Sequence, residues 1–157
     1  MSEHDFELEP RLESQTGPAL ESGERLIESF SGNLTTYVKE HVLLAALGSV
    51  LMSGILIYMG NPHAWTGVVG AVAAIAVRGV YVAREQVGFT WYLTNRRLIG
   101  PGNRTILLGN IAKVNTIFSA AQVVTTMGDK YMMKYQADTK ATQAAIDRAR
   151  GVMGDTV

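Results

Sequence analysis

HVLLAALGSVLMSGILIYMG (residues 41–60) and AWTGVVGAVAAIAVRGVYVA (residues 64–83) together contain only one Lys, Arg, Asp or Glu, which is Arg78. A short polar turn joins the two runs. A helix rises about 1.5 Å per residue, so each run of roughly 20 residues is long enough to cross a hydrocarbon layer about 30 Å thick. A buried hairpin in a water-soluble helical domain is the alternative. The first run has no polar face at helical spacing, so the sequence favours a transmembrane hairpin over residues 41–83.

The flanking charges predict the orientation of this hairpin. Its turn has no lysine or arginine, whereas Lys39 precedes the first run and Arg84 follows the second. Because basic residues are enriched on the cytoplasmic side of membrane proteins, both termini are expected to be cytoplasmic. The first run starts late and follows an acidic stretch, which favours a signal anchor over a cleaved signal peptide.

Composition limits what surrounds the hairpin. The chain has 157 residues, no cysteine and a formal net charge of zero. This leaves room for one small domain of about 70 residues and fits a reducing compartment. Residues 1–22 hold six acidic residues and one basic residue, and they predict an acidic disordered tail. Such a tail is either solvated, docked on a basic partner, or folded back on the basic domain of its own chain.

The remaining segments have β character. Residues 23–40 form a juxtamembrane segment, of which 23–33 alternates weakly and is a candidate first strand. Residues 84–157 predict a small antiparallel β domain that ends in a helix, with Asp138 as N-cap and Gly151 as C-cap. The fold class is therefore predicted to be α+β, with a transmembrane hairpin followed by the β domain. The expected strands of that domain are 89–94, 96–100, 104–108, 113–118, 122–126 and 130–136.

Residues 91–99, WYLTNRRLI, resemble the YxLTNxRLI signature of bacterial pleckstrin-homology-like (PH-like) domains, a family of membrane proteins with a short helical hairpin before a small β domain. The similarity continues through ILLGNIAKV (106–114) and covers roughly residues 89–150. It implies a seven-stranded PH-like domain that serves interaction, in a protein of the bacterial inner membrane. Residues 23–33 would have to supply the seventh strand.

The LTNRR core (residues 93–97) can also be interpreted from strand and turn geometry alone. Arg96 and Arg97 are consecutive in a strand and point to opposite faces, so one can bridge the turn while the other meets solvent or lipid phosphate. Structural and phosphate-binding roles both stay open. Asn95 is expected to adopt a positive φ in this turn. The candidate residues for binding lipid or a partner are Arg78, Arg84, Arg96, Arg97 and Arg104.

Arg78 is unusual because it lies inside the second apolar run. It either snorkels to the inner interface or forms an ion pair with a partner's carboxylate or a bound anionic lipid. Small residues on both helices allow close packing, within the hairpin or against a partner. These helix-packing candidates are Ser49, Ser53, Gly67, Gly70, Ala71 and Ala74.

Neither a catalytic constellation nor a metal or cofactor site is expected. The three histidines, His4, His41 and His63, lie too far apart along the predicted topology to share a metal or a nucleophile. Basic residues dispersed at a membrane surface meet anionic lipid first, so nucleic-acid binding is not expected either. The sequence favours a non-enzymatic accessory or assembly subunit that binds integral membrane proteins. A tether or sensor of anionic lipid is the runner-up, and a self-associating scaffold is the third alternative.

Overall fold

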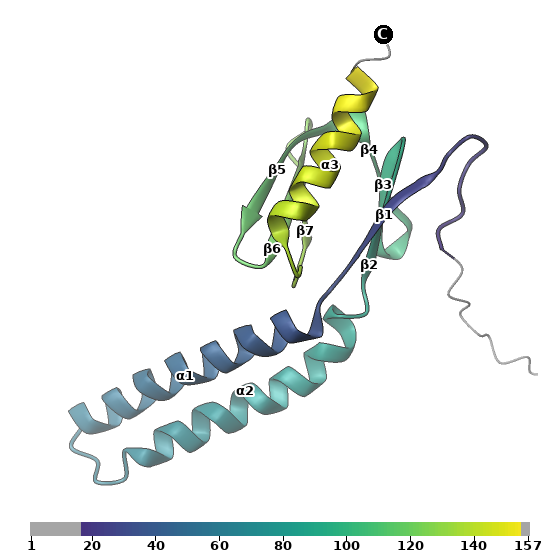
Figure 1. Cartoon of the computed structure of the whole chain (residues 1–157). Coiled ribbons are helices and arrows are strands. Elements are labelled where there is room, and N and C mark those ends of the chain that lie inside the picture. Colours follow the sequence, from purple (N-terminus) through teal and green to yellow (C-terminus); the bar gives the residue numbers. More distant parts are fainter. Residues whose placement is uncertain (1–16, 155–157) are drawn as a thin grey trace, which may run out of the picture.

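The computed structural model describes residues 17–154, apart from the side chains of 84–86 and 152–154. This part of the chain is an α+β structure, in which two long helices extend from a small β domain (Figure 1). The elements in chain order are β1 (Leu26–Ser31), α1 (Leu34–Tyr58), α2 (Trp65–Gln86), β2 (Thr90–Thr94), β3 (Arg97–Gly100), β4 (Arg104–Leu107), β5 (Ile111–Ile117), β6 (Ala120–Thr125), β7 (Lys130–Met133) and α3 (Thr139–Gly154).

Helices α1 and α2 lie side by side as a hairpin. Helix α1 begins before the apolar run because Asn33 caps it, its Oδ1 accepting a hydrogen bond from the Thr36 N–H at 3.0 Å. Both helices are long and apolar enough to cross a membrane. Their apolar side chains are mostly exposed, so neither helix is buried in the core of the described part of this chain.

Strand β1 confirms the candidate first strand within residues 23–33. It precedes the hairpin and pairs antiparallel with β2, from Leu26 opposite Thr94 to Ser31 opposite Thr90. The hairpin is thus the connection between the first two strands, as the candidate strand at 23–33 implies, and it does not simply precede the β domain. The weak alternation of residues 23–33 could not settle this point, because the partner strand lies beyond the whole hairpin.

The β domain contains two antiparallel sheets. Strands β1, β2, β3 and β4 form the first in that order, and β5, β6 and β7 form the second. The six expected strands are all found, with ends shifted by up to three residues. Leu93 and Leu98 of the first sheet cluster with Val123 and Met133 of the second, and Ile146 of α3 completes this core. Each of these side chains is fully buried.

Helix α3 begins as expected and ends later than expected. Asp138 caps it, since its Oδ1 accepts a hydrogen bond from the Ala141 N–H at 2.9 Å. One side of the helix is buried, at Thr142, Ala145, Ile146 and Ala149. The C-cap assigned to Gly151 is wrong, because Gly151 has no positive φ and the helix continues through it to Gly154.

The turns between strands also differ from expectation at one position. Asn95 does not have a positive φ; Gly102 (71°) and Asn103 (58°) in the β3–β4 turn do. The Asn95 side chain serves a different purpose, because its Oδ1 accepts a hydrogen bond from the Arg25 N–H at 2.9 Å. Nearby, a Cβ on Gly100 would lie 2.5 Å from the Trp91 ring, so the close approach of this strand to the indole requires glycine.

Candidate functional site

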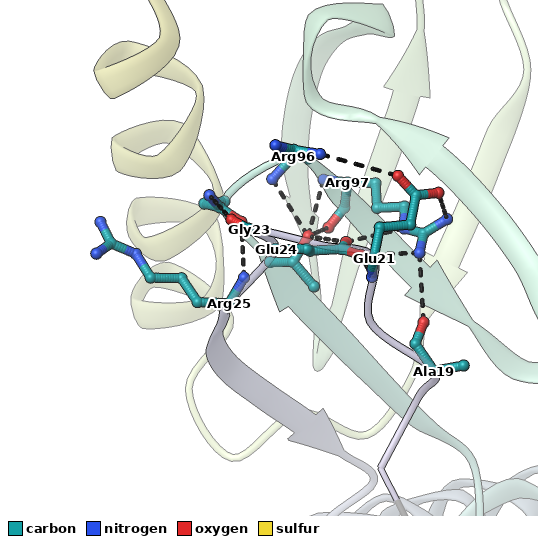
Figure 2. A network of polar contacts seen from close by, with 9 residues as sticks. Ala19, Glu21, Gly23, Glu24, Arg25, Arg96 and Arg97 are labelled. Atoms are coloured by element: carbon teal, nitrogen blue, oxygen red, sulfur yellow. Dashed lines mark hydrogen bonds and ion pairs between the residues drawn. The ribbon is translucent and has the colours of Figure 1, made fainter.

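A buried ion pair fastens the segment before β1 to the start of β3. The Arg97 Nε and Nη2 donate to the two carboxylate oxygens of Glu24, each at 2.8 Å (Figure 2). Thr94 Oγ1 donates to the same carboxylate at 2.7 Å. The side chain of Glu24 is 1% exposed and that of Arg97 is 17% exposed. This two-pronged geometry holds β1 against its neighbours far more specifically than a single contact would.

The carboxylate of Glu24 is charged at physiological pH. Hydrogen bonds from Arg97 hold the pKa of Glu24 at about 2, below its usual value of 4.5, although burial acts in the opposite direction. The Glu21 N–H and the Thr94 hydroxyl lower this pKa further. Bonding to Glu24 raises the pKa of Arg97 in turn. Neither group can exchange protons near neutral pH, so this network is suited to fastening the fold rather than to acid–base chemistry.

The network separates the roles of the two arginines in the LTNRR core. Arg97 is the internal bridge, and it also meets Glu21 at 3.1 Å and the Ala19 carbonyl at 3.3 Å. Arg96 is half exposed. Its Nη1 lies 3.9 Å from a carboxylate oxygen of Glu21. Of this pair, only Arg96 remains available to a ligand or partner.

The acidic segment before β1 therefore folds back on its own domain at its C-terminal end, through Glu21. The disorder predicted for residues 1–22 concerns mainly residues 1–16, which lie outside the described residues. Sequence reasoning missed Glu24 altogether. Its partner Arg97 is 73 residues further along the chain, and no local pattern distinguishes this glutamate from its acidic neighbours.

Arg104 borders a hollow of about 220 Å³ on the β domain. Its guanidinium lies 5.1 Å from the centre of the Tyr131 ring, a cation–π distance. Lys134 lines the same hollow, together with Trp91 and the half-exposed Phe89, which lies three residues after the end of α2. The hollow thus combines two positive charges with aromatic surface next to the end of the hairpin.

Tyr37 joins the base of the hairpin to the β domain. Its hydroxyl donates to the Gly79 carbonyl of α2 at 2.7 Å, and its ring packs edge-on against Tyr135 of the β domain, with 4.8 Å between the ring centres. The Asn33 N–H also donates to the Tyr135 carbonyl at 2.7 Å. Burial raises the pKa of the Tyr135 hydroxyl, so this side chain is neutral at physiological pH.

The position of Arg78 follows from this junction. It precedes Gly79, so it lies level with the first turn of α1, at the end of the hairpin next to the β domain. Its side chain is exposed on α2. Arg84 also belongs to α2, but its side chain lies outside the described residues.

The helix-packing candidates divide into two groups. Gly67 and Ala71 face α1, since a Cβ on Gly67 would lie 2.8 Å from the Ser53 backbone nitrogen and the Ala71 Cβ lies 3.5 Å from one built on Gly48. The second group, Gly70 and Ala74, is exposed, and a Cβ on Gly70 would meet no atom within 4 Å. Ser49 bonds the Ala45 carbonyl of its own helix at 2.7 Å.

Two contacts in the hairpin, at Gly48 and at Gly79, were not predicted from the sequence. A Cβ on Gly79 would lie 3.3 Å from the His41 ring. Small residues at Gly67, Ala71 and Gly79 share one side of α2, but Gly70 and Ala74 have the same four-residue spacing, so the sequence does not distinguish the two sides. In the described part of the chain, no group of three or more His, Asp or Glu side chains is placed to hold a metal ion.

Comparisons of the chain with family models, with curated proteins and with solved structures found no match. The class that the described residues define is thus an α+β protein with two long, exposed, apolar helices inserted between the first two strands of its β domain.

Proposed function

We propose that this chain is a non-enzymatic, membrane-anchored interaction protein with a PH-like domain, acting as an accessory or assembly subunit of a larger complex in the bacterial inner membrane. The observation that carries the proposal is the exposed apolar surface of α1 and α2. Side chains such as Val50 of α1 and Val77 of α2, each 74% exposed, lie on helices that extend away from the β domain (Figure 1). Such a surface requires lipid or other apolar helices to cover it.

A permanent membrane anchor explains this surface better than a cleaved signal sequence does. Removing α1 by cleavage would also remove β1 and Glu24, and with them the edge of the first sheet and the buried ion pair. Orientation with both termini in the cytoplasm is supported by charge. Lys39 and Arg78 lie at the end of the hairpin next to the β domain, and the turn at residues 61–63 has no lysine or arginine.

The PH-like assignment is supported by the strand arrangement. The resemblance implies seven strands followed by a helix, and the described residues contain sheets of four and three strands followed by α3. Strand β1 supplies the strand that the meander after the hairpin lacks. A domain of this kind, held against the membrane by its own β1–β2 connection, is well placed to bind the cytoplasmic surface of an integral membrane partner.

Lateral packing would use the face of α2 that turns away from α1. Gly70, Ala74 and Arg78 are exposed and recur at four-residue spacing, so they form one stripe along the helix. Small residues permit close approach of a second helix, and an arginine at the end of the stripe can pair with a partner's carboxylate.

Replacing both Gly70 and Ala74 by leucine is expected to lower recovery of co-purifying membrane subunits about tenfold or more, because the added side chains hold a partner helix away. The amount of inserted protein should not change. The measurement is gentle detergent extraction of the tagged full chain followed by quantitative mass spectrometry of proteins and lipids. Val72→Leu, at an exposed position off the stripe, is the control.

The same experiment tests the runner-up function. The hollow beside Arg104 and Lys134 favours an anionic headgroup as ligand. Enrichment of anionic lipid that is lost in a variant with Arg104→Gln and Lys134→Gln, without any protein subunit, would replace the subunit proposal with the lipid tether. Unchanged recovery of every subunit in the leucine variant would remove the lateral-packing surface.

A further inference from the structure

Strand β1 has a free edge. It is the terminal strand of the first sheet, and in the described part of the chain no strand pairs with its outer side. Leu26 is 45% exposed and Ile27 is 49% exposed. An uncovered edge with apolar side chains presents backbone N–H and C=O groups to any extended segment that approaches, unless something protects it.

A groove follows this edge along its whole length, between β1 and α3. One hollow of about 270 Å³ is lined by Ile27 and Glu28 on one side and by Ala145 on the other. A second, of about 290 Å³, continues from Glu28 to Ser31 and faces Ala141. Because both hollows include Glu28, they join end to end. On the α3 side, both hollows are lined partly by small side chains, among them Ala141, Ala145 and Ala149.

The charges along the groove are polarised. Arg25 and Arg148 line the hollow farther from the hairpin, Glu28 lies where the two hollows meet, and Asp138 lines the hollow where β1 leads into α1. The groove therefore favours an occupant with an acidic residue at its distal end. Six residues of strand span about 20 Å, so that residue would lie about 20 Å from the base of the hairpin.

We propose that this groove binds an extended juxtamembrane segment of a membrane partner, which adds to β1 as a fifth strand of the first sheet. The segment enters at the hairpin end, where the partner's own transmembrane helix would lie, and places a carboxylate beside Arg25 and Arg148. This inference rests on the proposed subunit function and names the cytoplasmic contact that the function requires.

The test is photocrosslinking in cells that produce the full chain. A benzoylphenylalanine at Ile27 is expected to give a discrete crosslinked product with one integral membrane protein, mapped by mass spectrometry to a juxtamembrane stretch with Asp or Glu at its membrane-distal end. The same probe at Leu107, exposed on the opposite edge strand β4, should not give this product. Arg148→Glu should lower the yield about fivefold or more, whereas Lys130→Glu on β7 should leave it unchanged.

The outcomes separate the two proposals. A crosslink to lipid, to this chain itself, or to a helical segment would overturn the strand-addition inference, as would equal yields with Arg148→Glu. If a subunit co-purifies but the Ile27 probe yields no product, the groove inference is wrong and the subunit proposal stands. If no subunit co-purifies and the chain is alone in the detergent extract, both are wrong.

Discussion

Glu24→Gln is expected to lower the free energy of unfolding of the β domain by about 1.5–3 kcal/mol, the range found for hydrogen bonds to charged groups. The amide keeps the size of the side chain, but it removes the charge that accepts two hydrogen bonds from Arg97. The measurement is denaturant unfolding of the full chain in mild detergent, followed by the fluorescence of the buried Trp91 in a Trp65→Phe background.

Glu21→Gln is the matched control for this variant. The Glu21 side chain is 62% exposed, although it also contacts Arg97, so its loss should change stability by less than about 1 kcal/mol. Equal effects of the two substitutions would show that burial of the Glu24 carboxylate contributes nothing to the fold.

The same pair predicts a dependence of stability on pH. The pKa of Glu24 is about 2 in the folded chain and near 4.5 when unperturbed, so the unfolded state binds a proton first as the pH falls. The stabilisation is complete above pH 4.5 and decreases between pH 4.5 and about 2. Glu24→Gln should therefore lose less stability than the unmodified chain over this interval, and parallel curves would contradict the assignment.

Gly67→Leu is expected to separate the two helices of the hairpin. A Cβ on Gly67 would lie 2.8 Å from the backbone nitrogen of Ser53, an atom that cannot move aside as a side chain can. Overpacking of this kind costs about 1–3 kcal/mol and more for a large side chain against backbone. Gly70→Leu, one turn away at an open position, should leave the hairpin intact.

Hairpin closure can be measured with a disulfide, because the chain has no cysteine of its own. Gly48→Cys and Ala71→Cys together place the two Cβ atoms about 3.5 Å apart, within the range that a disulfide accepts. Oxidation should join them efficiently in the parent and with Gly70→Leu. With Gly67→Leu the yield should fall about fivefold or more. An undiminished yield would mean that the helices do not pack through Gly67.

The contrast between Gly67 and Gly70 illustrates what the sequence could and could not predict. The existence of two long helices followed from their continuous apolar runs. Which faces meet did not, because a helix that is apolar all round carries no amphipathic signal to identify its contact side. Small residues recur at four-residue spacing both at Gly67 and Ala71 and at Gly70 and Ala74, so their spacing does not identify the contact side either.

Long-range pairing was the second limit. The strands after the hairpin follow from alternating side chains and turn residues, since these are local properties. The pairing of β1 with β2 and of Glu24 with Arg97 depends on residues about 60 or more positions apart, and a short, weakly alternating segment gives no sign of its partner. The roles of Arg96 and Arg97 became distinct only once Glu24 was placed.

The central claim, that a hairpin crosses the membrane and holds the β domain on its cytoplasmic side, is tested most directly by labelling single cysteines in intact cells. Asn61→Cys lies in the turn between α1 and α2, and Asn103→Cys lies in the β3–β4 turn of the β domain. An impermeant thiol reagent added from the periplasmic side should label the first in intact cells and the second only after lysis. Labelling of Asn103→Cys but not Asn61→Cys in intact cells would contradict the orientation, and labelling of neither before lysis would contradict the membrane-spanning hairpin.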